Sequence, residues 1–134
     1  MTRKTTALAL TTVLTAAGLV VTTSPAQAAP AGCPRASFCV WRNTGWSGGI
    51  YTASGSDWWW GNDNFSGTSV SVADDDSSWF NNGILNGDDP TYVRVYDDYY
   101  QTGATTICLR YGTGFSSRPA SNDRGGSHGW YYGC

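Results

Sequence analysis

The sequence predicts an all-β domain in which short strands pack face to face as a sandwich. Residues 29–134 contain 16 of the 17 glycines, a composition that favours tight turns over long helices. No segment repeats apolar residues at the i, i+3, i+4, i+7 spacing over the length that a helix requires. Short alternating runs occur instead, each bounded by Gly, Asn, Asp or Pro.

About seven strands follow from these runs, at the spacing that is typical of a sandwich. The run Thr-Ser-Val-Ser-Val at 68–72 alternates without a break, and at 92–96 Val93 and Val95 alternate with larger or charged residues. In chain order, the predicted strands cover residues 37–41, 49–53, 57–60, 68–72, 92–96, 104–111 and 129–132.

Residues 1–28 have the pattern of a secretory signal peptide. Arg3 and Lys4 precede a mostly apolar run at 7–21, and Ala26-Gln27-Ala28 provides a small-x-small cleavage site. Thr residues interrupt the run, which is shorter than the roughly 20 apolar residues of a membrane span. We therefore expect a secreted, extracellular protein in which residues 29–134 form a single domain and a monomer.

The charges exclude two classes of partner. Residues 29–134 carry six arginines against ten aspartates, a net charge of −4, with no lysine or glutamate. Nucleic acids and anionic membranes attract basic surfaces, so neither is an expected partner.

Four cysteines predict two disulfides in an exported chain. Cys33, Cys39, Cys108 and Cys134 allow three pairings. The pairing Cys33–Cys39 with Cys108–Cys134 needs the fewest assumptions, because the close pair can bridge one turn. A zinc site is disfavoured, because the chain has no Cys-x-x-Cys spacing and a single histidine.

An internal repeat organises the predicted strands. Residues 38–48 and 93–103 both show a strand, an aromatic residue, a polar turn, and a glycine seven positions after the aromatic. The pairs are Trp41 with Gly48 and Tyr96 with Gly103. A glycine there permits positive φ or the close approach of a ring. The repeat predicts two similar halves that bury one core together, joined by a linker at 81–90.

The repeat resembles the βγ-crystallin Greek-key signature. The opening Cys-Pro-Arg-Ala-Ser-Phe-Cys-Val-Trp-Arg-Asn behind a signal peptide is similar to the SMPI-like secreted metalloproteinase inhibitors built on that fold. The resemblance implies a disulfide-stapled sandwich of two Greek-key motifs, at about 33–80 and 91–134. It also implies inhibition of an extracellular metalloprotease through substrate-like, non-covalent occupation of its active site, with no cofactor required.

The linker contains the expected inhibitory residues. Ile84 and Leu85 stand between two Asn-Gly turns, and the resemblance implies metalloproteases that prefer a bulky apolar residue just after the scissile bond. The alternative is that both side chains pack inward as a short strand. No cysteine lies between residues 40 and 107, so this loop has no disulfide of its own.

The crystallin-type resemblance also implies a calcium signature, of which each half keeps a damaged copy. Residues 73–78 have Ala73 in the first slot, and residues 122–127 have Gly126 where a hydroxyl is expected. Calcium needs six to eight oxygen ligands, so solvated turns are the alternative interpretation. The candidate calcium ligands are Asp74, Ser77, Asn122 and Asp123.

No catalytic centre is expected, and the protein is interpreted as a non-enzyme. Gly45-Trp46-Ser47-Gly48-Gly49 matches a nucleophile elbow, but that motif requires a strand-to-helix turn on a large α/β sheet. His128 is the sole imidazole, and the aspartates occur in polar turns.

Three adjacent indoles, Trp58, Trp59 and Trp60, are candidate contacts for a partner. With 19 aromatic residues against ten Val, Ile and Leu after position 28, much of the core must consist of rings. On an extended strand, Trp58 and Trp60 would share one face and Trp59 would occupy the other. Either both faces are covered or an exposed indole serves a partner. The rival function is therefore a non-catalytic binding module for calcium, a glycan or another cell-surface partner.

Overall fold

The computed structural model describes residues 27–134. The predicted signal peptide therefore lies outside the described residues, apart from its last two positions. Seven strands form the domain: β1 (Ser37–Asn43), β2 (Ser47–Ala53), β3 (Ser78–Asn82), β4 (Tyr92–Tyr96), β5 (Thr105–Arg110), β6 (Thr113–Phe115) and β7 (Ser127–Tyr131). Two single-turn 3-10 helices, η1 (Trp60–Asn62) and η2 (Tyr99–Gln101), occur in the loops. None of the helices in this part of the chain is long and apolar enough to cross a membrane.

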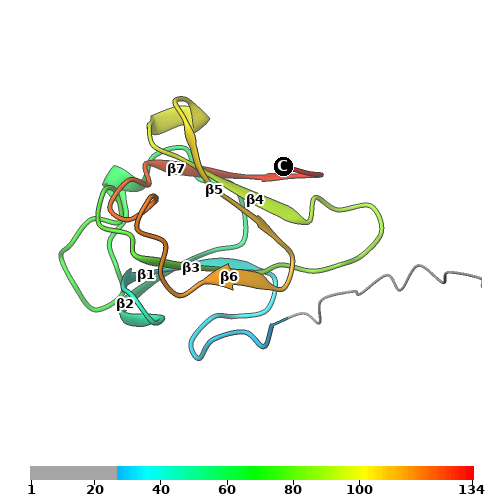
Figure 1. Ribbon diagram of the computed structural model, residues 1–134, viewed down its shortest axis with the longest axis horizontal. Coiled ribbons are helices and arrows are strands. Elements are labelled where there is room, and N and C mark those ends of the chain that lie inside the picture. Colours follow the sequence, from blue (N-terminus) through cyan, green and yellow to red (C-terminus); the bar gives the residue numbers. More distant parts are fainter. Residues whose placement is uncertain (1–26) are drawn as a thin grey trace, which may run out of the picture.

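The strands form two antiparallel sheets that face each other (Figure 1). One sheet has the order β2-β1-β3-β6, and the other has the order β5-β4-β7. Strand β6 follows β5 in the chain but pairs with β3 in the opposite sheet. This exchange ties the two halves together, because the sheet of the first half is completed by a strand from the second half.

The core between the sheets consists mainly of rings and branched aliphatic residues. Alternate residues of β1 face it, so Phe38 and Val40 are fully buried among the inner residues of β4 and β5. The opposite face of β1 is also covered, because Cys39 and Trp41 pack with Phe80 in a second cluster. The main core comprises Phe38, Val40, Trp60, Phe65, Val72, Trp79, Val93, Val95, Ile107 and Leu109.

Two disulfides close the domain with the pairing that the sequence favours. Cys33–Cys39 joins the segment before β1 to β1 itself. Cys108–Cys134 joins β5 to the C-terminal residue. The described residues contain no free cysteine.

The two halves repeat an unusual backbone conformation at an offset of 55 residues. Gly45, Trp46 and Gly48 have positive φ in the β1–β2 hairpin. Tyr100, Gln101 and Gly103 have positive φ at the equivalent positions of the β4–β5 hairpin. Polar side chains pack over the two hairpin glycines: Asn43 over Gly48, and Asp97 over Gly103. Of the two alternatives for these glycines, the positive φ is confirmed, whereas the side chain that packs over each glycine is polar and not a ring.

Two of the predicted strands are wrong. Residues 57–60 form only a bridge between Asp57 and His128, because the chain turns into η1 at Trp60. Residues 68–72 form only a bridge between Asn64 and Ser71, although the sequence alternates. There the Thr68 hydroxyl donates to the Phe65 carbonyl and accepts from the Val70 amide, a turn that competes with strand pairing.

Candidate functional site

The linker leaves the sandwich on anchored stems. Its first residues belong to β3, so the loop itself begins at Gly83. The Asn81 amide is buried and donates to the carbonyls of Thr91 (3.0 Å) and Leu109 (2.9 Å). The Asn82 amide donates to the carbonyls of Cys33 (3.0 Å) and Pro34 (2.9 Å), within the loop closed by Cys33–Cys39. Side-chain amides therefore brace a loop that contains no cysteine.

Ile84 and Leu85 have different environments in this loop. Leu85 is 62% exposed and is the only exposed large aliphatic side chain in residues 27–134. Ile84 is half-buried and lines a groove of about 470 Å³. The groove is lined by Ala36, Ser54, Gly55, Ser56, Gly83, Ile84, Asp89, Pro90 and Trp130. The alternative in which both side chains pack inward is thus wrong for Leu85.

The tryptophan triplet divides differently from the predicted alternation. Trp58 and Trp59 are both exposed, whereas Trp60 is fully buried. The strand geometry that would place Trp58 and Trp60 on one face is absent, because η1 rotates the chain at Trp60. Trp60 therefore belongs to the core and is not accessible to a partner, whereas Trp58 and Trp59 are.

The sole histidine has a structural role. His128 is fully buried; its Nδ1 accepts from Trp60 Nε1 (2.9 Å), and its Nε2 lies 2.9 Å from the Gly55 carbonyl. The Trp60 contact requires an unprotonated Nδ1, so the neutral tautomer donates through Nε2. Burial lowers the pKa of His128 to about 4. An enclosed, neutral imidazole with both nitrogens engaged is a poor general acid or base.

The perturbed carboxyl groups also have structural partners. Burial raises the pKa of Asp63 to about 6, and hydrogen bonding to Asp57 acts in the same direction. Although burial favours a neutral Asp57, hydrogen bonds from the Tyr51 hydroxyl and the Trp59 amide hold its pKa below the ordinary value. These bonds attach the segment before η1 to β2.

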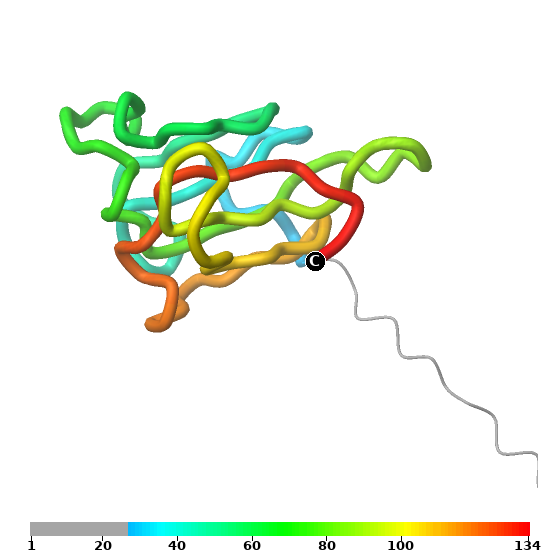
Figure 2. Tube along the Cα trace, turned by 90° about the horizontal axis from the view of Figure 1, so that it is seen from above, coloured from blue at the N-terminus to red at the C-terminus, as the bar shows by residue number. Residues whose placement is uncertain are grey.

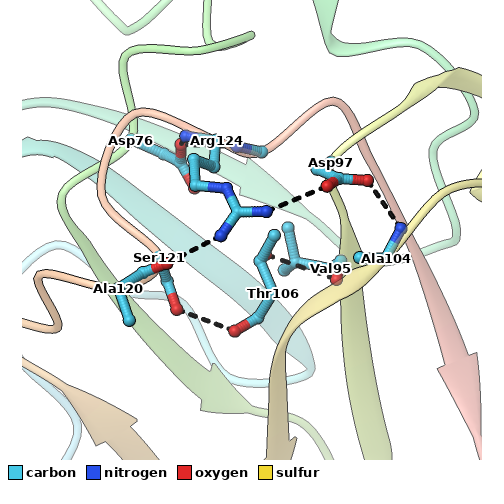
Figure 3. A network of polar contacts seen from close by, with 9 residues as sticks. Asp76, Val95, Asp97, Ala104, Thr106, Ala120, Ser121 and Arg124 are labelled. Carbon is cyan, nitrogen blue, oxygen red and sulfur yellow. Dashed lines mark hydrogen bonds and ion pairs between the residues drawn. The ribbon is translucent and has the colours of Figure 1, made fainter.

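A second polar network joins the two halves around the calcium-like loops. The Asp74 amide donates to the Gly125 carbonyl (2.9 Å), and the Asp123 amide donates to the Asp76 carbonyl (2.8 Å). In the same region, the guanidinium of Arg124 donates to the Ala120 carbonyl and to Asp97, both at 3.0 Å (Figure 3). The network connects segments more than 20 residues apart and positions both loops.

The calcium candidates occupy equivalent places in these loops. Asp74 and Asp123 are exposed and share positive φ, at 58° and 55°. Ser77 is buried and Asn122 is half-buried. Within residues 27–134, no three His, Cys, Asp or Glu side chains gather as a metal-binding group. Calcium binding at these loops therefore stays a prediction.

Within the residues that the structure describes, the serine of the nucleophile-like motif is not hydrogen-bonded to a histidine or a carboxylate. Ser47 is exposed at the start of β2, and its hydroxyl donates to the Thr44 carbonyl (2.8 Å). The sole histidine is enclosed in the core. A serine without an accessible base lacks the activation that nucleophilic catalysis requires.

The sequence reasoning missed two residues on the exposed surface beside Trp58 and Trp59. Tyr99 and Tyr100 in η2 are both exposed. The Tyr100 amide donates to the Trp58 carbonyl (2.6 Å), and the Tyr99 ring lies 6.1 Å from that of Trp59. The repeat contains a signal for Tyr100, because Gly45 occupies the equivalent position in the first half.

Comparisons with known proteins agree with this fold. Residues 26–108 match peptidase inhibitor family I36. One similar solved structure comes from work on the evolution of the eye lens βγ-crystallin domain fold, with a TM-score of 0.57, 16% identity, and coverage of 75% of this chain and 90% of the other. A second is a βγ-crystallin from an archaeon, with a TM-score of 0.51, 15% identity, and coverage of 70% and 95%. No curated protein matches significantly. The chain belongs to peptidase inhibitor family I36 and adopts the βγ-crystallin fold.

Proposed function

We propose that the protein is a secreted inhibitor of metalloproteases that presents Leu85 to the active-site cleft. Family membership supports protease inhibition in general. The observation that carries the finer proposal is the exposed Leu85 in a loop whose first residues follow the anchored Asn81 and Asn82. An extracellular metalloprotease is the expected partner, and no cofactor is needed.

The loop has the features that substrate-like inhibition requires. Leu85 supplies a bulky apolar side chain for the pocket just after the scissile bond, so the Ile84–Leu85 peptide bond would lie at the catalytic position. Ile84 is half-buried against the groove, which limits the freedom of the preceding backbone. Binding then orders few additional side chains and so loses little conformational entropy.

The stems also provide resistance to cleavage. If the protease cut the Ile84–Leu85 bond, the new ends would remain attached by the Asn81 and Asn82 amides on one side. On the other side, the Tyr132 hydroxyl donates to the Asp88 carbonyl (3.2 Å). Product ends that stay in place favour religation and slow release, so the inhibitor can remain bound.

A protease panel with matched variants tests the proposal. Thermolysin-like, serine and cysteine proteases are titrated with the purified protein and with Leu85→Asp, Leu85→Met and Tyr100→Gly variants. We expect inhibition of a metalloprotease at micromolar concentration or below. Leu85→Asp should raise the inhibition constant at least about 100-fold, because burying an unpaired carboxylate in an apolar pocket costs several kcal/mol.

The control variants distinguish an effect of the Leu85 side chain on inhibition from a general loss of folding. Leu85→Met retains bulk and should change the inhibition constant less than about tenfold, since such swaps are tolerated. Tyr100→Gly lies outside the loop and should inhibit like the unmodified protein. Leu85 makes no contribution to the core, so its variants should keep the melting temperature. Equal inhibition by Leu85→Asp would show that another surface blocks the protease, and inhibition of serine or cysteine proteases alone would exclude the metalloprotease proposal.

A further inference from the structure

Four exposed rings form one surface in η2 and in the segment just before η1. Trp58 (61% exposed), Trp59 (45%), Tyr99 (41%) and Tyr100 (67%) make up this aromatic patch. Figure 1 shows η1 and η2 toward the left and the linker loop extending to the right, and Figure 2 shows the same separation from above. A partner on the patch would therefore leave Leu85 free.

The patch is held in place by its backbone. The Tyr100 amide donates to the Trp58 carbonyl and joins the two loops. The Trp59 amide donates to Asp57 Oδ1 (3.0 Å), and the Tyr99 amide donates to Asp98 Oδ1 (2.8 Å). The rings of Trp59 and Tyr99 meet edge to face, with an interplanar angle of 77°. Backbone hydrogen bonds, and not burial of the rings, therefore fix the loops that carry these exposed side chains.

Tyr100 has an unfavourable conformation that its packing does not explain. Its φ of 57° and ψ of 28° lie in the left-handed region, which strongly favours glycine over tyrosine. At the equivalent position of the first half the chain has Gly45, with φ of 71°. Because the Tyr100 ring is mostly exposed, it adds little to the core in return. The strained position holds this ring outward beside Trp58.

The surroundings of the patch are acidic. Segments 54–64 and 97–104, which form it, contain four aspartates and no Arg, Lys or His. Asp97 is paired with Arg124 at 3.0 Å, and Asp57 accepts from the Tyr51 hydroxyl and the Trp59 amide. The exposed Asp98, next to Tyr99, is therefore the carboxylate that a cation on the rings can reach. Tryptophan and tyrosine faces attract cations, and nearby carboxylates strengthen that attraction. The patch is therefore complementary to positive charge.

We propose that the aromatic patch binds a cationic peptide segment of a partner protein, with arginine or lysine side chains over the rings and near Asp98. The partner is distinct from the protease at the linker loop, because η1 and η2 lie away from the outer end of the linker loop in both views. Through the patch, the inhibitor can be retained on a basic extracellular protein while Leu85 remains available.

The probe is an eight-residue peptide of alternating glycine and arginine, with a citrulline version that keeps the side-chain shape but removes the charge. Intrinsic tryptophan fluorescence is titrated with each peptide at 20 and 200 mM salt. We expect the arginine peptide to bind at least tenfold more tightly than the citrulline peptide. The higher salt concentration should weaken arginine-peptide binding at least threefold, because it screens exposed charges.

Tyr100→Gly is the most informative variant. Glycine suits the left-handed backbone, so the variant should melt at the same or a higher temperature and yet bind the peptide at least fivefold more weakly. Asp98→Asn should also weaken binding, whereas Tyr132→Ala, which removes an exposed ring outside the patch, should not. Leu85→Asp should bind the peptide normally, so the patch and the inhibitory loop are tested independently.

Several results would overturn the proposal. These are equal affinity for the arginine and citrulline peptides, affinity independent of salt, unchanged binding by Tyr100→Gly, or no binding at 1 mM peptide. Soluble β-1,4-linked oligosaccharides serve as a neutral comparison. If they quench the fluorescence more strongly than the arginine peptide, the patch recognises a glycan and the cationic partner is wrong.

Discussion

Replacing Asp76 by asparagine tests how the two halves are joined. Asp76 is fully buried beneath the calcium-like loops. It accepts hydrogen bonds from Trp79 Nε1 (2.7 Å), the Gly125 amide (2.8 Å) and the Arg124 amide (3.0 Å). Asparagine keeps the shape and one acceptor oxygen, which serves both amides. Its NH2 group would face the Trp79 donor, so one hydrogen bond is lost.

The magnitude follows from the pKa of the buried carboxyl. Burial raises the pKa of Asp76 from 3.8 to about 6, because desolvation outweighs the three donors. The difference between the folded and the unfolded pKa of Asp76 corresponds to a free energy of about 3 kcal/mol, since each tenfold step in proton affinity corresponds to ~1.4 kcal/mol. A folded-state pKa above the unfolded value means that the stabilisation is fully present below pH 3.8. It is lost as the pH rises through about 6.

The loss of stability in the Asp76→Asn variant should therefore be larger at low pH than at neutral pH. Losing the Trp79 hydrogen bond costs about 1–3 kcal/mol at every pH. At pH 7.5 the variant also avoids the burial of a charged carboxylate, which offsets that loss by about 3 kcal/mol. We expect Asp76→Asn to be close to the unmodified protein at pH 7.5 and clearly less stable at pH 4.

Urea unfolding followed by far-UV circular dichroism at pH 4, 5, 6 and 7.5 measures the difference. His128 and Asp63 titrate in both proteins, so their contributions cancel. Asp75→Asn is the control, because Asp75 forms a surface ion pair with Arg42 and should contribute at most about 1 kcal/mol. A destabilisation that grows from pH 4 to pH 7.5 would refute the reasoning, because it would mean that the three donors outweigh desolvation.

Two further predictions concern the remaining buried and acidic groups. The pKa of His128, lowered by burial to about 4, lies below its ordinary value of 6.5, so the unmodified protein should lose up to about 3 kcal/mol as the pH falls from 6.5 to 4. His128→Gln should show a flatter pH dependence in the same urea series, and an equally steep one would exclude His128 as its source. Calcium at 1 mM should raise the melting temperature by less than about 1 °C relative to EDTA, because each loop lacks an expected oxygen ligand. A rise of several degrees, abolished in Asp123→Ala, would instead establish a calcium site.

Sequence patterns located the strands whose side chains alternate between the core and a covered or solvated face. Strands β1, β2, β4, β5 and β7 lie close to the predicted ranges. Strand β3 was missed because its sequence, Ser-Trp-Phe-Asn-Asn, is buried on both faces and ends in two polar residues. The amides of those residues are satisfied by distant carbonyls, which no local pattern can indicate.

The exposure of the candidate residues was only partly predictable. Leu85 lies between Asn-Gly turns, which indicates a loop but not whether the loop folds back on the sheet. Trp60 is buried in the main core, and its indole N–H donates to His128, 68 residues away. Both contacts depend on the tertiary fold. The positive φ of Tyr100 could have been inferred from the repeat, since Gly45 marks the same position.

Comparing the β1–β2 hairpin with the β4–β5 hairpin shows which features the fold requires and which side chains can differ. Both copies need the same run of positive φ. In the first, Gly45 meets that requirement, and Trp46 turns inward and packs edge to face on Phe80 at 6.4 Å. In the second, Tyr100 meets it at greater conformational cost and stays exposed. The linker is not part of either hairpin, so its residues need neither the positive φ nor the packing of the hairpin positions. Leu85 can therefore be exposed there, while Asn81 and Asn82 hold the start of the loop in place. Tyr100 departs from the repeat and Leu85 lies outside it, and at such positions a duplicated scaffold can vary its surface without loss of its core.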